Sequence, residues 1–153
     1  MGGADAGVGS IEHAAESLLA SPIYAGYATN VDEAVTWWRS AAGDAAIEHL
    51  AATDVAVTPT LVAYEGFAEM ARGTADYELR QRGLVFLIEL TGRLHRAGVT
   101  ILAGSDFSSQ ELPVVPGKSL LREVELLQQA GLSRGEALAA AGSNISRWLK
   151  RPR

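Results

Sequence analysis

The chain has 153 residues, enough for one domain of ordinary size or for a piece of a larger one. Hydrophobic residues make up 48% and charged residues 20%, a composition that predicts a folded globular chain. The net charge of −5 gives no electrostatic reason to expect nucleic acid or an anionic membrane as a partner. Because there is no cysteine, disulfides, thiolate metal sites and cysteine nucleophiles are excluded. No apolar run approaches the roughly 20 residues of a membrane helix, and residues 1–10 are unlike a signal peptide, so we expect a soluble, cytoplasmic protein.

Three short apolar runs predict buried β-strands at residues 8–12, 55–59 and 99–103. The second run is rich in β-branched residues and ends at Pro59, and the third is continuously apolar, as in buried parallel strands. The first run is the least apolar, and its interpretation as a strand depends on His13, which follows it.

Apolar residues at spacings of three and four predict helices between and after these strands. The longest covers residues 78–97 and stops at Gly98, where a glycine can take the left-handed conformation that closes a helix. Further helices are predicted at residues 30–40, 44–53 and 118–130, and from a capping box formed by Ser133 and Glu136.

Strands that alternate with helices of this length predict an α/β fold with parallel strands and right-handed crossovers. Three strands do not close an eight-stranded barrel, which needs about 250 residues. The pattern therefore leaves two architectures open, a small open sheet and a part of a TIM-type (β/α) barrel. We interpret residues 1–153 as a single domain, with residues 14–43 as an irregular loop or helix insertion.

Two residues with metal-binding side chains stand where predicted strands end. Asp106 follows the strand at 99–103, and His13 follows the strand at 8–12. Ligands gather at the carboxyl ends of strands in parallel α/β folds. A carboxylate there can ligate a metal or take a proton from water, and a neutral imidazole is a good zinc ligand. The structural alternatives are that Asp106 caps a turn and that His13 only packs.

Other residues carry less functional information. Trp37 and Trp38 either line a pocket or pack in the core. His49 and His95 lie within predicted helices and have no catalytic role in this interpretation. The sequence contains no glycine-rich phosphate loop, no Gly-x-Ser-x-Gly elbow and no His-Glu-x-x-His helix.

The strand segments combine into a longer pattern. Residues 7–13 are Gly-Val-Gly-Ser-Ile-Glu-His, residues 57–61 are Val-Thr-Pro-Thr-Leu, and residues 97–106 are Ala-Gly-Val-Thr-Ile-Leu-Ala-Gly-Ser-Asp. In this order they resemble the sixth, seventh and eighth strand motifs of metal-dependent amidohydrolases of the imidazolonepropionase-like and prolidase-like branch. Residues 116–144 are similar to the closing helices of that family, so the resemblance covers nearly the whole chain.

The resemblance implies strands six to eight of a TIM-like barrel that binds one or two divalent metal ions, usually zinc. It implies hydrolysis of C–N bonds in small amides, cyclic amides or dipeptide-like substrates by metal-activated water. By the same resemblance Asp106 is a metal ligand and also the catalytic residue that moves the proton. His13 is a ligand of the second metal or, in single-metal members, contacts the substrate.

The resemblance is also incomplete. The family's His-x-His pair, its fourth-strand lysine and its fifth-strand histidine have no counterpart, whereas a catalytic zinc site normally has three protein ligands. We therefore expect the isolated chain to bind metal weakly or not at all, to be inactive or nearly so, and to self-associate through exposed strand edges. Two alternatives stay open: a non-catalytic half-barrel that acts as an interaction or regulatory module, and an unrelated small α/β binding domain in which His13 and Asp106 lie far apart.

Overall fold

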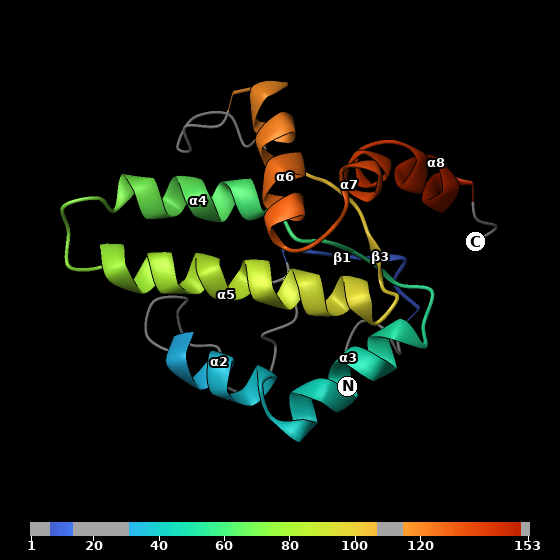
Figure 1. Cartoon of the computed structure of the whole chain (residues 1–153), viewed down its shortest axis with the longest axis horizontal. Coiled ribbons are helices and arrows are strands. Elements are labelled where there is room, and N and C mark those ends of the chain that lie inside the picture. Colours follow the sequence, from blue (N-terminus) through green and yellow to red (C-terminus); the bar gives the residue numbers. More distant parts are fainter. Residues whose placement is uncertain (1–6, 14–30, 107–114, 151–153) are drawn as a thin grey trace.

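The computed structural model describes residues 7–13, 31–106 and 115–150. Strands and helices alternate along the chain (Figure 1). In chain order the elements are β1 (Ser10–Glu12), α2 (Val31–Trp38), α3 (Ala41–Ala51), β2 (Ala56–Thr58), α4 (Leu61–Met70), α5 (Tyr77–Arg96), β3 (Thr100–Ile101), α6 (Lys118–Gln129), α7 (Arg134–Ala140) and α8 (Ser143–Leu149).

The three strands form one parallel sheet in the order β1-β2-β3. Ile11 pairs with Val57, and Val57 pairs with Ile101, so the middle strand is β2. The predicted α/β class with parallel strands is confirmed, and all three predicted strands are present. Each ladder is shorter than its apolar run. At β3, for example, Val99 and Leu102 are buried but lie outside the paired segment.

The predicted helices are present with ends shifted by at most a few residues. The predicted helix at 78–97 is α5, and Gly98 after it has φ 94°, the left-handed conformation expected of a closing glycine. The capping box of Ser133 and Glu136 opens α7 as predicted. Of the stretch 14–43, residues 14–30 lie outside the described part, and the rest forms α2 and the start of α3.

Helix α4 is the element that the sequence pattern did not predict. It begins within three residues of the end of β2 and buries six of its ten residues, among them Leu61, Ala63, Tyr64 and Ala68. A helix that is apolar on most of its surface has no polar stripe to mark the helical period. The signal that identified α5 and α6 was therefore missing for α4.

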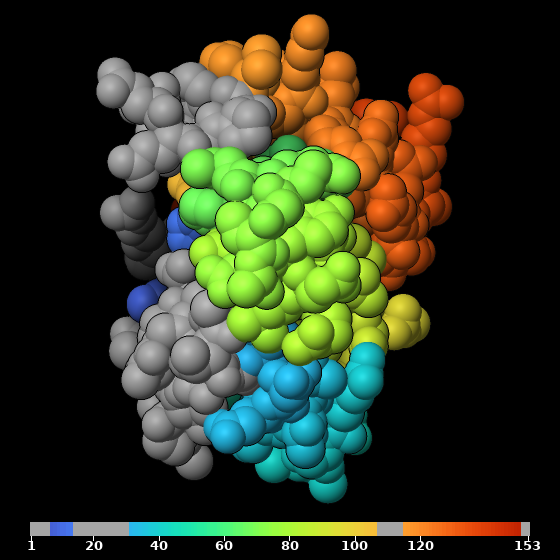
Figure 2. All heavy atoms as spheres, turned by 90° about the vertical axis from the view of Figure 1, so that its left-hand side faces the viewer, coloured from blue at the N-terminus to red at the C-terminus, as the bar shows by residue number. Residues whose placement is uncertain are grey.

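The helices pack in layers beside the sheet. Helices α4 and α5 lie antiparallel and side by side, and α6 crosses next to α4 (Figure 1). Figure 2 shows the face that these elements form, with α2 and α3 at one end and α6 at the other. Within the described ranges, no helix is long and apolar enough to cross a membrane.

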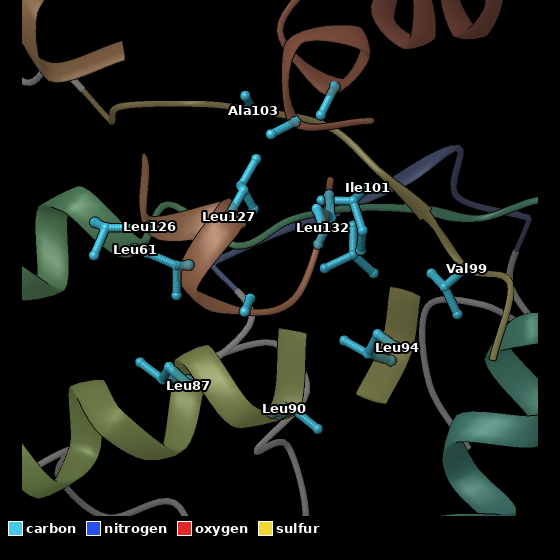
Figure 3. Packing of buried hydrophobic residues seen from close by; sticks show 14 of the residues in the cluster. Leu61, Leu87, Leu90, Leu94, Val99, Ile101, Ala103, Leu126, Leu127 and Leu132 are labelled. Atoms are coloured by element: carbon cyan, nitrogen blue, oxygen red, sulfur yellow. The ribbon is translucent and has the colours of Figure 1, made fainter. Parts of the chain in front are cut away.

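The core lies between α5, α6 and the strands (Figure 3). Its leucines on α5 and α6 are spaced by three, four or one residue, so they face the same interior. Full burial of each such side chain stabilises the fold by about 1.5–3 kcal/mol. The side chains at its centre are Leu61, Leu87, Leu90, Leu94, Ile101, Leu126, Leu127 and Leu132.

Helices α2 and α3 are held to α5 by a tryptophan and an arginine. Trp38 is 2% exposed and makes an edge contact with Trp37, with ring centroids 4.9 Å apart. Arg93 donates to the Trp38 carbonyl oxygen at 2.6 Å and to Asp44 Oδ1 at 2.7 Å. The packing role for Trp38 is therefore the correct one of its two readings.

Helices α7 and α8 cover the outer edge of β3. Asn144 Nδ2 donates to the Ile101 carbonyl oxygen at 3.0 Å, and the Ala103 amide donates to the Ala140 carbonyl oxygen at 3.0 Å. These bonds satisfy groups that a further strand would otherwise pair. Self-association through strand edges stays a prediction.

Candidate functional site

The three strands share an unusual feature where they end. His13 (φ 57°), Thr60 (φ 50°) and Asp106 (φ 45°) all have left-handed backbones, and they are the residues other than glycine with positive φ in the described part of the chain. Each follows the carboxyl end of a different strand. A positive φ is uncommon for residues with side chains, and for a β-branched threonine it is a marked outlier. Such strain clusters at functional sites, so this edge of the sheet is the candidate site.

His13 and Asp106 come together at this edge. His13 Nε2 lies 3.8 Å from Asp106 Oδ1, and the two side chains are 33% and 34% exposed. The His13 amide continues the parallel ladder by donating to the Thr58 carbonyl oxygen at 3.0 Å, which fixes its backbone beside β2. The prediction that both residues lie at the same end of the sheet is confirmed. The expectation, attached to the unrelated-domain alternative, that the two residues lie far apart is wrong.

Thr60 orients the His13 ring. The Thr60 hydroxyl has one proton and donates it to the Pro59 carbonyl oxygen at 2.8 Å. The same hydroxyl oxygen lies 3.1 Å from His13 Nδ1, so it accepts a hydrogen bond from an Nδ1–H. If the Thr60 hydroxyl proton stays directed at the Pro59 oxygen, a neutral His13 would carry its proton at Nδ1 and turn the lone pair of Nε2 toward Asp106. This pattern of an oriented imidazole is common behind metal-ligating histidines.

Gly104 lets the chain after β3 approach the chain after β2. A Cβ at this position would lie 2.6 Å from Cγ2 of Thr58 and 3.6 Å from Cγ2 of Thr60. The first distance is too short for any side chain, so only glycine fits here without a shift. The close passage brings Asp106 within reach of His13.

A buried carboxylate lies behind Thr60. Glu123 of α6 is 0% exposed, and its Oε2 accepts a hydrogen bond from the Val62 amide at 2.7 Å. Burial raises the pKa of Glu123 to about 7, against the opposing hydrogen bonds from the Val62 and Leu61 backbone. Its other oxygen, Oε1, has no hydrogen-bond partner among the residues that the structure describes. Sequence reasoning overlooked Glu123, although a carboxylate on the apolar face of the helix at 118–130 was a usable signal.

The pair of His13 and Asp106 fits two positions of a divalent metal site. Two ligand atoms of a tetrahedral zinc ion lie about 3.3 Å apart at bond lengths of about 2.0–2.1 Å, close to the separation found here. Within residues 7–13, 31–106 and 115–150, no group of three His, Cys, Asp or Glu side chains could hold a metal ion. The described residues thus supply two ligands where a catalytic zinc site normally has three.

Two surface hollows lie elsewhere. One of about 250 Å³ lies between β3, α7 and α8 and includes the His95–Glu136 pair, whose Nε2 and Oε1 atoms are 3.4 Å apart. The other, of about 400 Å³, lies between α4 and α6. Neither is lined by the site residues His13, Thr60 or Asp106.

The fold and site together define a parallel α/β domain with a histidine and a carboxylate converging at the carboxyl edge of its sheet. No family model, curated protein or solved structure matches the chain. The likeness to amidohydrolases therefore rests on the sequence motifs alone.

Proposed function

We propose that this chain carries part of the metal centre of a divalent-metal-dependent hydrolase, with His13 and Asp106 as ligands to one ion. The observation that supports this most is the approach of His13 Nε2 and Asp106 Oδ1 to 3.8 Å at the carboxyl edge of a parallel sheet. Ligand sites of α/β proteins favour that edge. The left-handed backbone of both residues adds support, because such strained conformations cluster at functional sites.

Each residue has a distinct task in this proposal. His13 presents the lone pair of Nε2, while Thr60 holds its Nδ1–H. Asp106 binds through one carboxylate oxygen, takes the proton of the attacking water and passes it to the leaving nitrogen. The divalent ion, when bound, lowers the pKa of water and polarises the carbonyl group of the substrate.

The bond class comes from the strand motifs. Their resemblance to imidazolonepropionase-like and prolidase-like amidohydrolases favours a C–N bond of an amide, cyclic amide or dipeptide-like small molecule. In the same proposal β1, β2 and β3 correspond to strands six to eight of a TIM-type barrel. Parallel pairing in the order β1-β2-β3 is compatible with that correspondence. Further ligands have to come from outside the described residues, so we expect this chain alone to bind metal weakly.

A zinc titration of the chain tests the proposal. We expect fast-exchange NMR shifts that concentrate on His13 and Asp106. The rise in unfolding free energy should be small, about 0.4 kcal/mol when free zinc equals its dissociation constant. Both effects should disappear in His13→Ala and in Asp106→Asn.

His95→Ala is the matched control, because His95 also faces a carboxylate, that of Glu136, but lies away from the site at the hollow between β3, α7 and α8. It should leave the zinc shifts of His13 unchanged. Zinc binding that persists in both His13→Ala and Asp106→Asn would contradict the proposal.

A further inference from the structure

Thr60 occupies the N-cap position of α4 but does not cap it. Its backbone is left-handed, at φ 50° and ψ 43°, and its side chain makes no bond to the helix. Ser133 at the N-cap of α7 shows the usual arrangement, with extended backbone at φ −62° and ψ 160° and a side chain that accepts from the Glu136 amide. The Thr60 hydroxyl instead faces Pro59 and His13.

Glu123 caps α4 in place of Thr60. Its carboxylate reaches from α6 to the start of α4 and accepts from the Val62 amide at 2.7 Å, and the Leu61 backbone also lowers the pKa of Glu123. The amides of Leu61 and Val62 belong to the first turn of the helix, where no carbonyl oxygen of the helix is available. Because Glu123 is fully buried, bulk water does not compete with it as the acceptor in the native fold.

Two roles compete for the Thr60 hydroxyl. Without Glu123, the buried amides of Leu61 and Val62 would need another acceptor, and the side chain of the N-cap residue is the nearest in sequence. That role requires the extended backbone, which threonine favours over the left-handed one. A cap of this kind stabilises the start of a helix, and leaving the left-handed conformation relieves backbone strain. Both effects would move the hydroxyl away from His13.

We propose that Glu123 is a positioning residue of the site: by capping α4 it keeps Thr60 left-handed and so fixes the His13 proton at Nδ1. The contact series runs from Glu123 through the start of α4 and Thr60 to the His13 ring. The inference rests on the proposed function for its purpose, since a metal ligand needs a free Nε2. The contacts themselves can be tested on the metal-free chain.

The ¹⁵N chemical shifts of the imidazole nitrogens report the tautomer, measured without metal at a pH where His13 is neutral. We expect the Nδ1–H tautomer to predominate in the native chain. In Glu123→Ala and in the milder Glu123→Asp, whose carboxylate is one methylene shorter, its share should fall several-fold. Glu123→Gln keeps an acceptor oxygen at the same reach and should retain the native tautomer.

Ser133→Ala is the matched control, because it removes the cap of α7 and should destabilise the fold while leaving the His13 tautomer unchanged. Thr60→Val removes the hydroxyl and should reproduce the Glu123→Ala shift. The double variant of Thr60→Val and Glu123→Ala should show no larger change of tautomer than either single variant, because both act on one hydrogen bond.

The outcomes separate this inference from the proposed function. A native chain in which His13 carries its proton at Nε2 overturns the inference even if no variant folds, and so does a folded Glu123→Asp or Glu123→Ala with the native tautomer. Tautomer shifts as expected, together with zinc binding that ignores His13, would leave the inference standing and overturn the proposed function.

Discussion

The two ends of the sheet differ in which residues take the left-handed backbone conformation. At the amino end, the left-handed position before β3 is occupied by Gly98, and Gly9 packs under Trp148, whose indole nitrogen donates to the Gly9 carbonyl oxygen at 2.9 Å. A Cβ at Gly9 would lie 3.3 Å from the Trp148 ring. At the carboxyl end, three residues with side chains, His13, Thr60 and Asp106, take the left-handed conformation.

In the proposed function, this difference separates the end of the sheet that serves the fold from the end that carries the proposed ligands. A glycine takes positive φ at no steric cost, so the left-handed turn at the amino end adds no backbone strain. The carboxyl end accepts about 1–3 kcal/mol of strain at each such residue. The side chains retained by that strain are those that converge on one point. This difference can be tested by replacing a left-handed residue with glycine at one end and a glycine with alanine at the other. It can also be tested by changing the residues that support the carboxyl end.

The largest expected effect is a pH dependence that belongs to the carboxyl end. The pKa of Glu123 is raised to about 7 from 4.5, so between these values the folded chain holds a proton that the unfolded chain has released. Stability should therefore be highest near pH 4.5 and fall by about 3 kcal/mol as pH rises through 7. Urea unfolding at pH 5 and pH 8 measures the difference.

Glu123→Gln should remove most of this pH dependence, because its amide does not titrate. The pKa values of Glu89 and Glu136 are lowered by hydrogen bonds, from Arg39 and Ser133 respectively, so their contributions change below pH 4.5, outside the window. An equal fall in the native chain and in Glu123→Gln would show that another group causes it.

A methyl group at Gly104 should disturb both the packing and the site. The new Cβ would lie 2.6 Å from Cγ2 of Thr58, so the chain after β3 must shift. We expect Gly104→Ala to lower the unfolding free energy by about 1–3 kcal/mol and to weaken zinc binding further, because Asp106 moves away from His13. Gly135→Ala is the matched control, since nothing lies within 4 Å of its Cβ. Equal stability of the two variants would refute the close-approach argument.

The sequence predicted the elements with a clear period or a clear boundary. Strand 99–103 and helix 78–97 were found because Gly98 separates an apolar run from a one-sided helical pattern. Asp106 was predicted as a site residue because its position at a strand end and the motif agreed, whereas the prediction for His13 depended mostly on the motif. Apolar runs report burial, however, and not hydrogen-bonded register, so the predicted strands were longer than the ladders.

Other features depend on contacts that no local pattern contains. Helix α4 is buried on most sides and lacks an amphipathic stripe. Thr60 looks like an ordinary turn residue until its backbone conformation is known. Glu123 gains its role from Val62, which is 61 residues away in the sequence. The supporting residues were therefore harder to predict than the residues that face the solvent.

The smallest expected effect is also the most direct comparison of the two ends. Asp106→Gly should relieve its left-handed backbone and raise the unfolding free energy by up to about 1 kcal/mol, although it removes a proposed ligand. Gly98→Ala places a side chain at φ 94° and should lower the unfolding free energy by about 1 kcal/mol or more. Thermal or urea unfolding of both variants gives the signs. If Asp106→Gly is less stable than the native chain, the Asp106 side chain contributes more to the fold than its backbone strain costs. The left-handed conformation of Asp106 would then be explained by stability and would not support the proposed site.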